Sequence, residues 1–330
     1  MSRPALTDPF RIGDVEIANR VLLAPLAGIG NWFVRLQARR HGAGLAVSEM
    51  VSSHALHYRN ERTMRELLVI HPAEHPVSMQ LFGADPEVMR DAAGIVASAG
   101  VDLVDLNMGC PVKKVCKTGA GAALLADPDL AVEVARAAVE GSGLPVTVKV
   151  RSGLKAGDRS GLDLAQRLVE EAGVSGIAFH PRPATVQHRG QPDYALVREL
   201  VERVAVPVIV SGGLQSAAKA RHAYEASGAD AVMIARGSFG NPWIFEELVG
   251  QRKQAPTADE IVAELLWVTE CAEQHLGPRA CRYLRKFYPW YMERLGLSAA
   301  EADRFQRIDD LEEVRGLIRA MADEPLGVGA

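Results

Sequence analysis

Cysteine is scarce in this 330-residue chain, and its four cysteines form no C-x-x-C pair. That spacing argues against a zinc ribbon and against a redox-active dithiol. The chain also lacks a basic-then-apolar leader, and none of its apolar runs is long enough to span a bilayer. These absences predict a protein of the reducing cytoplasm with no membrane segment and no metal site.

An excess of positive charge is missing as well. The chain has 37 Lys and Arg against 41 Asp and Glu, which gives a formal net charge of −4. Any contact with nucleic acid must therefore use a local basic patch. A hydrophobic content of 48% and a charged content of 24% are ordinary for a globular protein, and the length allows about two domains.

The glycine-rich fingerprint of a dinucleotide-binding sheet is also absent. After the first apolar segment the chain reads Leu26-Ala27-Gly28-Ile29-Gly30, and the cluster at 119–121 also fails the G-x-G-x-x-G spacing. An open, doubly wound sheet would carry that motif after its first strand. The sequence therefore favours a different arrangement of parallel strands.

Eight apolar segments predict buried parallel strands. They are Val21–Pro25, Leu45–Glu49, Pro76–Phe82, Val101–Asn107, Pro145–Val150, Gly176–His180, Val206–Val210 and Ala231–Ile234. Amphipathic helical patterns lie between them at Pro86–Ala99, Asp129–Val139, Asp163–Glu171, Tyr194–Arg203 and Ala217–Ser227. This alternation predicts the α/β class and a closed (β/α)₈ TIM barrel.

The segments on either side of the barrel predict different structures. Phe10–Ile17 alternates around a Gly-Asp turn and predicts a hairpin that could cap the bottom of the barrel. A polar linker at 250–257 precedes a helix-capping pattern at Thr257–Glu260, and helical patterns continue to about Met321 before a frayed tail. We therefore predict a barrel domain over residues 1–250 and a helical domain over 251–330.

Polar side chains follow the predicted strands at the ends where the chain leaves them. They are Glu49, Gln80, Asn107, Lys149, Arg151, His180, Arg182, Ser211 and Arg236. The carboxyl ends of barrel strands share one face, and the active site of this fold is built there. Any one of these residues could simply cap its strand, but their recurrence at several ends favours a site.

Two glycine-containing loops follow the last two predicted strands, at 211–213 and 236–238. In this fold these loops often hold a phosphate, because glycine lets backbone N–H groups approach an anion and Arg adds bidentate charge. Either loop alone could be an ordinary turn. Together they predict a phosphorylated ligand.

Three inward-facing candidates each have a structural alternative. Lys149 lies in an apolar strand and would meet either an electron-rich ligand, such as N1 and O2 of a reduced flavin, or a buried carboxylate of Glu49 or Asp105. Gln80 would bond a heterocycle or a neighbouring strand end. His180 would contact a ligand or be a satisfied structural histidine.

The turn Asn107–Pro111 places the thiol of Cys110 directly after the fourth predicted strand. From the residues alone, Cys110 is either a reacting group or a small apolar residue packed on the turn, since free cysteine commonly packs as a buried hydrophobe. Cys116 is interpreted as structural or incidental.

Several motifs together resemble the tRNA-dihydrouridine synthases, in particular the bacterial B-type subgroup. The matching segments are Leu23–Ile29, Ser48–Met50, Asn107–Lys114, Lys149–Gly153 and Ala231–Arg236. The stretch Asn-Met-Gly-Cys-Pro-x-Lys-Lys is the most specific, whereas the others occur loosely in several flavin barrels.

The resemblance implies a barrel that binds FMN and uses NADPH to reduce specific uridines of tRNA to 5,6-dihydrouridine. It implies that Cys110 donates the proton and that Asn107, Arg151 and His180 face the flavin or the uracil. The implied FMN contacts are Pro25, Leu26, Ala27, Gln80, Lys149, His180, Ser211, Gly212, Gly213, Ala235 and Arg236.

Three departures from the family pattern lie near these positions. His180-Pro181-Arg182-Pro183 stands where the family usually has His-Gly-Arg-Thr, and this change alters a loop near the ligand. Ser211-Gly212-Gly213 replaces the common Asn-Gly-Asp but keeps the glycine needed for backbone approach. Ala235 replaces a glycine before Arg236. We interpret all three as variation within the subgroup.

The implied chemistry explains why a thiol is needed. The C5=C6 bond of uracil is conjugated to the C4 carbonyl, so hydride from flavin N5 adds at C6 and a general acid must protonate C5. A cysteine near its reference pKa of about 8.5 is mostly protonated at neutral pH and is able to serve. Lys113, Lys114 and Lys117 would lower that pKa if they were close, so we expect them to face RNA phosphates instead.

A basic and aromatic segment, Arg279–Tyr291, predicts a local RNA patch. By spacing, Arg282, Arg285 and Lys286 share one helix face and would bind phosphates, while the aromatic residues pack or stack on unpaired bases. A solvated face over an aromatic core is the structural alternative.

Two other functions of the whole chain remain open besides tRNA reduction. One is an FMN barrel that reduces a small conjugated substrate, such as an ene-reductase or a dihydroorotate dehydrogenase. The other is a non-catalytic RNA-binding module that retains FMN.

Overall fold

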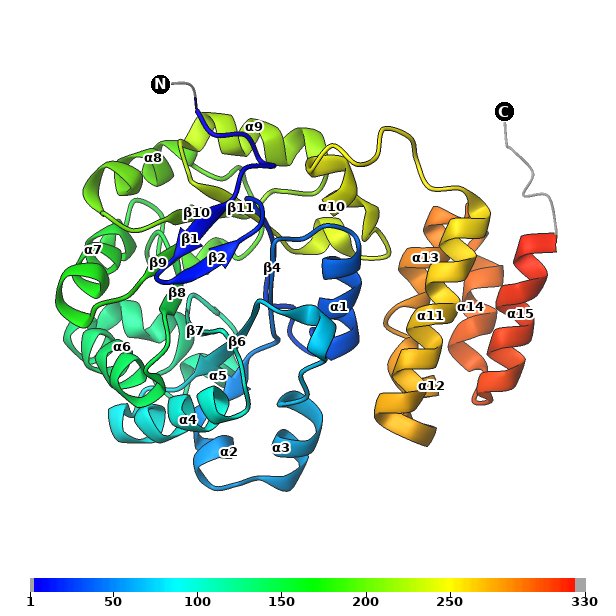
Figure 1. Ribbon diagram of the computed structural model, residues 1–330, viewed down its shortest axis with the longest axis horizontal. Helices are drawn as coiled ribbons and strands as arrows, with labels where there is room; N and C mark the ends of the chain where they lie inside the picture. Colours follow the sequence, from blue (N-terminus) through cyan, green and yellow to red (C-terminus); the bar gives the residue numbers. More distant parts are fainter. Residues whose placement is uncertain (1–2, 324–330) are drawn as a thin grey trace.

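The computed structural model describes residues 3–323, and a closed barrel of parallel strands lies at its centre (Figure 1). In sheet order the eight barrel strands are β4 (Leu45–Val47), β3 (Val21–Leu23), β11 (Ala231–Ile234), β10 (Val208–Ser211), β9 (Gly176–His180), β8 (Val146–Arg151), β7 (Leu103–Met108) and β6 (Val77–Phe82). The sheet closes because β4 pairs with both β3 and β6. The predicted TIM barrel is therefore confirmed, and the open sheet is excluded.

The strands begin and end close to the predicted residues. β9 and β11 match the prediction at both ends, whereas β7 begins two residues and β8 one residue later than predicted, and both end one residue later. The short strand β5 (Val51–Ser52) was not predicted, and it pairs with the carboxyl end of β6. Nearly all strand residues are buried, as expected for parallel strands covered on both faces.

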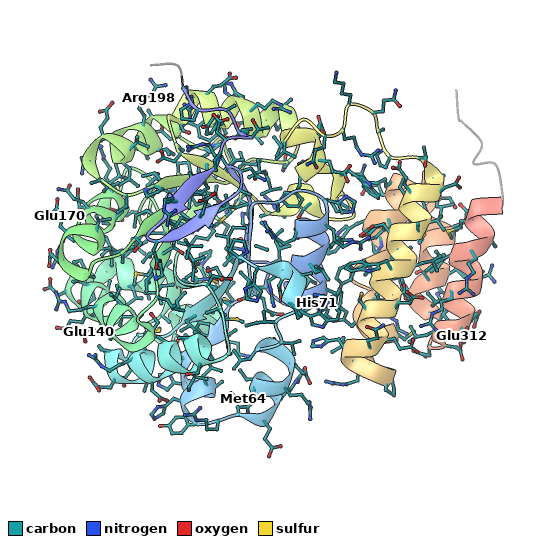
Figure 2. All side chains as sticks on the ribbon, in the orientation of Figure 1. Met64, His71, Glu140, Glu170, Arg198 and Glu312 are labelled. Atoms are coloured by element: carbon teal, nitrogen blue, oxygen red, sulfur yellow. The ribbon has the colours of Figure 1, made fainter. Side chains whose placement is uncertain are left out.

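Helices surround the barrel (Figure 1). The outer helices are α1 (Trp32–Arg40), α4 (Pro86–Ser98), α6 (Pro128–Ser142), α7 (Ser160–Ala172), α8 (Tyr194–Arg203), α9 (Ala217–Ser227) and α10 (Trp243–Leu248). Asp85 and Asp127 cap α4 and α6, each ahead of a proline at the first helical position. Glu140 and Glu170, labelled in Figure 2, lie exposed on α6 and α7 and show the charged outer face of this layer.

The N-terminal hairpin covers the amino ends of the barrel strands. It consists of β1 (Phe10–Ile12) and β2 (Val15–Ile17), which pair antiparallel. Phe10, Ile12 and Ile17 are buried in one cluster with side chains from the barrel interior. The hairpin therefore closes the bottom of the barrel, as predicted.

Every regular element that follows β11 within residues 3–323 is helical. After α10 these are α11 (Ala258–Leu276), α12 (Ala280–Leu284), α13 (Tyr288–Arg294), α14 (Ala299–Arg307) and α15 (Leu311–Asp323), with short 3-10 turns at 236–238 and 277–279. α11 starts at the predicted capping box of Thr257 and Glu260. The tail predicted to fray, 325–330, lies outside the described residues.

The basic segment is not one helix. α12 ends at Leu284, and Pro289 occupies the first turn of α13. In a first turn the missing N–H of proline costs nothing, whereas inside a continuous helix it would remove a hydrogen bond and break the helix. Arg285 and Lys286 therefore lie in a turn. The prediction that Arg282, Arg285 and Lys286 share one helix face is wrong for this reason.

The C-terminal helices dock against α1 through buried polar contacts. Gln37 donates from its Nε2 to Glu264 Oε1 at 2.8 Å and to the Tyr291 hydroxyl at 2.9 Å. Tyr283 and Phe287 pack on Phe33 with ring centroids 6.1 and 6.4 Å away. The aromatic residues of this segment thus mostly serve as core. No helix within residues 3–323 is long and apolar enough to cross a membrane.

Candidate active site

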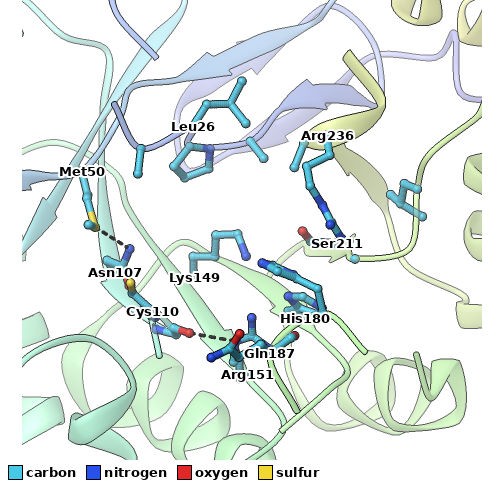
Figure 3. A pocket seen from close by; sticks show the side chains of 18 of the residues that line it. Leu26, Met50, Asn107, Cys110, Lys149, Arg151, His180, Gln187, Ser211 and Arg236 are labelled. Atoms are coloured by element: carbon cyan, nitrogen blue, oxygen red, sulfur yellow. Dashed lines mark hydrogen bonds between the residues drawn. The ribbon is translucent and has the colours of Figure 1, made fainter. Parts of the chain in front are cut away.

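A cavity of about 420 Å³ opens at the carboxyl ends of the barrel strands (Figure 3). The predicted residues that line it are Pro25, Leu26, Ala27, Gln80, Asn107, Cys110, Lys149, Arg151, His180, Ser211, Gly212, Gly213, Ala235 and Arg236. Of the sixteen site residues predicted in the barrel, only Lys113 and Lys114 lie outside this lining. The strand ends therefore converge as expected, while the role of each residue stays a prediction.

One side of the cavity has the features of an anion site. Gly212 and Gly213 have φ values of +98° and +84°, which favour glycine, and a Cβ on Gly212 would lie 2.4 Å from His180 Nε2. The N–H groups of Gly213 and Leu214 donate to no acceptor in the described part of the chain. Arg236 lines the same side with an exposed side chain (Figure 3). Together these groups fit a phosphate.

Lys149 projects from β8 into the cavity, next to its register partner Asn107 at the carboxyl end of β7 (Figure 3). Its ammonium makes no hydrogen bond or ion pair with any residue between 3 and 323, so the predicted alternative of a salt bridge to Glu49 or Asp105 is absent. Burial, together with the nearby Arg151 charge, lowers the pKa of Lys149 to about 8. An electron-rich ligand atom would satisfy this ammonium.

Cys110 is half-buried at the opposite wall (Figure 3). Its backbone N–H donates to Asn107 Oδ1 at 2.9 Å, which shapes the turn after β7. Burial raises the pKa of the Cys110 thiol and outweighs the opposing effect of the Arg151 and Lys149 charges. The thiol is therefore protonated at neutral pH. Lys113 is exposed on α5 (Lys113–Cys116), and the charges that act on the thiol are those inside the cavity.

Arg151 connects two loops at the cavity mouth. Its Nε donates to the Gly109 carbonyl at 2.9 Å, and one terminal nitrogen donates to the Gln187 carbonyl at 2.8 Å. Burial lowers the pKa of Arg151 to about 10, so the guanidinium remains charged at neutral pH. Arg151 thus holds the Cys110 loop against the loop that follows β9.

His180 is neutral in this site. Burial, with the Lys149 and Arg151 charges next, lowers its pKa well below the ordinary range. Arg182 donates to His180 Nε2 at 3.2 Å, so Nε2 is the acceptor and Nδ1 holds the proton. His188, which the sequence did not suggest, lines the cavity and stacks on His180 with ring centroids 6.1 Å apart. His188 lies in an irregular loop, far from any strand end, so no pattern pointed to it.

The amides of Gln80 and Asn107 bond to neighbouring strand residues inside the cavity wall. Gln80 donates from Nε2 to Asp105 Oδ2 at 2.6 Å and accepts from Asn107 Nδ2 at 2.9 Å. The bond from Gln80 to a neighbouring strand, which was the structural alternative to ligand binding, is thus present, and Gln80 also lines the cavity. Met50, also missed by the sequence analysis, accepts from Asn107 Nδ2 at 3.7 Å (Figure 3).

The residues predicted to bind RNA lie outside the cavity in different settings. Lys113, Lys114 and Arg282 are exposed. Arg285 forms an ion pair with Asp309 at 2.6 Å, and Lys286 donates to the Gly28 carbonyl at 2.8 Å. Lys286 therefore holds the loop after β3, whose residues 25–27 line the cavity. Across residues 3–323, no group of three or more His, Cys, Asp or Glu is placed to bind a metal.

The sequence of this chain is similar to those of proteins of known family over most of its length. The family model described as "Dihydrouridine synthase" matches residues 22–319. The tRNA-dihydrouridine synthase B of Pseudomonas aeruginosa is 36% identical over 310 residues, covering 92% of each chain. The protein of the same description from Shewanella oneidensis is 33% identical over 322 residues, covering 96% of this chain and 99% of that one.

Solved structures with a similar fold are more distant in sequence. An old yellow enzyme homologue from Zymomonas mobilis has a TM-score of 0.55 at 16% identity and covers 76% of this chain and 94% of that one. Morphinone reductase in complex with tetrahydroNAD has a TM-score of 0.52 at 16% identity, covering 78% and 94%. At this identity the likeness concerns the barrel fold alone.

Proposed function

Because the chain belongs to the dihydrouridine synthase family, we propose that it reduces specific uridines in tRNA to 5,6-dihydrouridine, with bound FMN and with NADPH as reductant. The observation that supports this most directly is the Cys110 thiol in a cavity that also presents the unpartnered Lys149 ammonium and the glycine loop at 212–213. Reduction of a conjugated C=C bond needs a hydride donor and a proton donor, and the thiol would supply the proton while the ammonium and the glycine loop would hold the hydride-donating cofactor.

The cavity residues fit FMN. The N–H groups of Gly213 and Leu214, with the Arg236 guanidinium, would hold its phosphate. Lys149 would meet the electron-rich edge of its ring, and Pro25, Leu26 and Ala27 would supply an apolar wall. When bound, FMN supplies the hydride that adds to C6 of the uracil.

The chain's own residues would then stabilise the negative charge on the base and donate the proton. Addition at C6 places charge on C5 and O4, and the thiol of Cys110 donates its proton to C5. Asn107 and Arg151 line the cavity and would donate to the carbonyl oxygens of the base, Asn107 in place of its long 3.7 Å contact with Met50 Sδ. A raised thiol pKa suits this role, because a donor must hold its proton until the charge develops.

Contacts with tRNA would come from exposed cations outside the cavity. Lys113 and Lys114 lie on α5, directly after the Cys110 turn, and Arg282 lies on α12. These would bind phosphates while the target base leaves its stack to enter the cavity. A tRNA substrate also agrees with the cytoplasmic location that the sequence predicts.

A direct assay tests the proposal against its alternatives. The purified protein, with its flavin confirmed by absorbance, is incubated with NADPH and an unmodified tRNA mixture, and dihydrouridine is measured by nucleoside mass spectrometry. We expect dihydrouridine at defined positions. NADPH oxidation with small enones but no product in any tRNA would favour the ene-reductase alternative, and tRNA binding without any turnover would favour the non-catalytic module.

A further inference from the structure

Asp105 is a buried carboxyl group to which the proposed chemistry gives no role. It lies in β7 with no exposed surface, and its register partners are Gln80 on β6 and Thr147 on β8. Thr147 donates from Oγ1 to Asp105 Oδ1 at 2.5 Å, and Gln80 donates from Nε2 to Oδ2 at 2.6 Å. Three adjacent strands thus bring these side chains together inside the barrel.

The hydrogen bonds that start at Asp105 have a defined direction. A carboxylate only accepts, so the NH₂ group of Gln80 must face it, and the Gln80 carbonyl oxygen must face Asn107. Asn107 then donates from Nδ2 to that oxygen at 2.9 Å. Its own carbonyl oxygen is left to accept the N–H groups of Gly109 at 3.2 Å and Cys110 at 2.9 Å.

We propose that Asp105 is a positioning residue that orients the amides of Gln80 and Asn107 and thereby holds the turn bearing Cys110. Without a pure acceptor at position 105, the Gln80 amide loses the partner that fixes its orientation. A Gln80 amide rotated by 180° would present NH₂ to the NH₂ group of Asn107, and the side chain that holds the turn would lose its acceptor.

The substitution Asp105→Asn tests this with a change of one atom. An asparagine is able to donate or accept, so it keeps the shape of the site but no longer sets the direction of the hydrogen bonds. We expect alkylation of Cys110 by iodoacetamide to become roughly 10-fold to 100-fold faster, because the turn loses a hydrogen-bond chain anchored on a charged group. Peptide mass spectrometry resolves Cys110 from Cys116, since Lys113 and Lys114 separate the two tryptic fragments.

A matched control and a double variant separate positioning from general damage. Thr147→Val removes the other partner of Asp105 but leaves the Gln80–Asn107 chain intact, so its alkylation rate should stay within about twofold of wild type. Gln80→Met breaks the chain downstream, so adding Asp105→Asn to it should change the alkylation rate little further. Denaturant unfolding confirms that each variant is folded.

The kinetic readout rests on the proposed function, whereas the alkylation readout does not. On tRNA, Asp105→Asn should lower kcat roughly tenfold or more while the KM for tRNA stays near wild type. A folded Asp105→Asn variant with wild-type alkylation of Cys110 would overturn the proposal, as would full additivity with Gln80→Met. If the wild type makes no dihydrouridine, the proposed function fails, and the alkylation data still decide the role of Asp105.

Discussion

Replacing Lys149 by methionine should stabilise the flavin-free protein and weaken its binding of FMN. The half-buried side chain of Lys149 lines the cavity without a partner for its ammonium in the described chain, and its pKa falls from an ordinary 10.5 to about 8. One pKa unit corresponds to about 1.4 kcal/mol, so the charged lysine costs the folded state at most roughly 3 kcal/mol at neutral pH, and less to the extent that water in the cavity screens the charge. Methionine fills similar space without that charge.

The pH dependence of this effect has a definite sign. The folded protein binds the Lys149 proton more weakly than the unfolded chain does, so the cost is fully present below pH 8 and disappears as the pH rises towards 10.5. The stability gained by Lys149→Met should therefore be largest at pH 7 and shrink at pH 9.5. Urea unfolding of flavin-free wild type and variant at both pH values measures it.

FMN binding should change in the opposite direction. A lost charge-assisted hydrogen bond to the ring should weaken FMN binding roughly 10-fold to 100-fold, as followed by flavin fluorescence. Lys113→Met, on exposed α5, serves as the control and should change neither stability nor FMN affinity. The reasoning is refuted if flavin-free Lys149→Met is no more stable than wild type at pH 7, or if it binds FMN equally well.

Three further predictions concern other parts of the site and its support. Gly212→Ala should weaken FMN binding at least roughly tenfold by titration, because its Cβ would lie 2.4 Å from His180 Nε2 at a φ of +98°; unchanged affinity would argue against a phosphate site here. Glu74→Gln removes the charge that faces fully buried Arg35 at 2.7 Å, and it should lower the free energy of unfolding in urea by about 3–5 kcal/mol. The control Glu140→Gln removes the exposed partner of Arg90 and should lower it by less than about 1 kcal/mol. Lys286→Met removes the donor to the Gly28 carbonyl, so hydrogen exchange in residues 26–31 should speed up roughly fivefold, and an unchanged rate would mean that Lys286 does not hold this loop.

The sequence was informative wherever a regular pattern set the position of a residue. Parallel strands of buried aliphatic residues gave the barrel, and the barrel alone brings strand ends such as Gln80, Lys149 and Arg236 to one face. Their convergence in one cavity therefore required no knowledge of side-chain contacts. The motif around Cys110 supplied the chemistry.

The remaining features depend on contacts that no local pattern encodes. The hydrogen bonds between Gln80, Asp105 and Asn107 follow from the register of adjacent strands. His188 approaches the cavity from an irregular loop, and Lys286 was assigned to RNA because the break before α13 was not expected. In each case the partner lies far away in the sequence, so only the folded structure identifies it.

Proton donation by Cys110 is tested directly by one measurement. Cys110→Ala protein, purified with its FMN, is mixed under single-turnover conditions with NADPH and unmodified tRNA, and dihydrouridine is quantified by mass spectrometry. We predict normal flavin content and normal tRNA affinity but no dihydrouridine, because alanine leaves the cavity wall without the thiol that would protonate C5. Dihydrouridine formed at the wild-type rate would contradict the account.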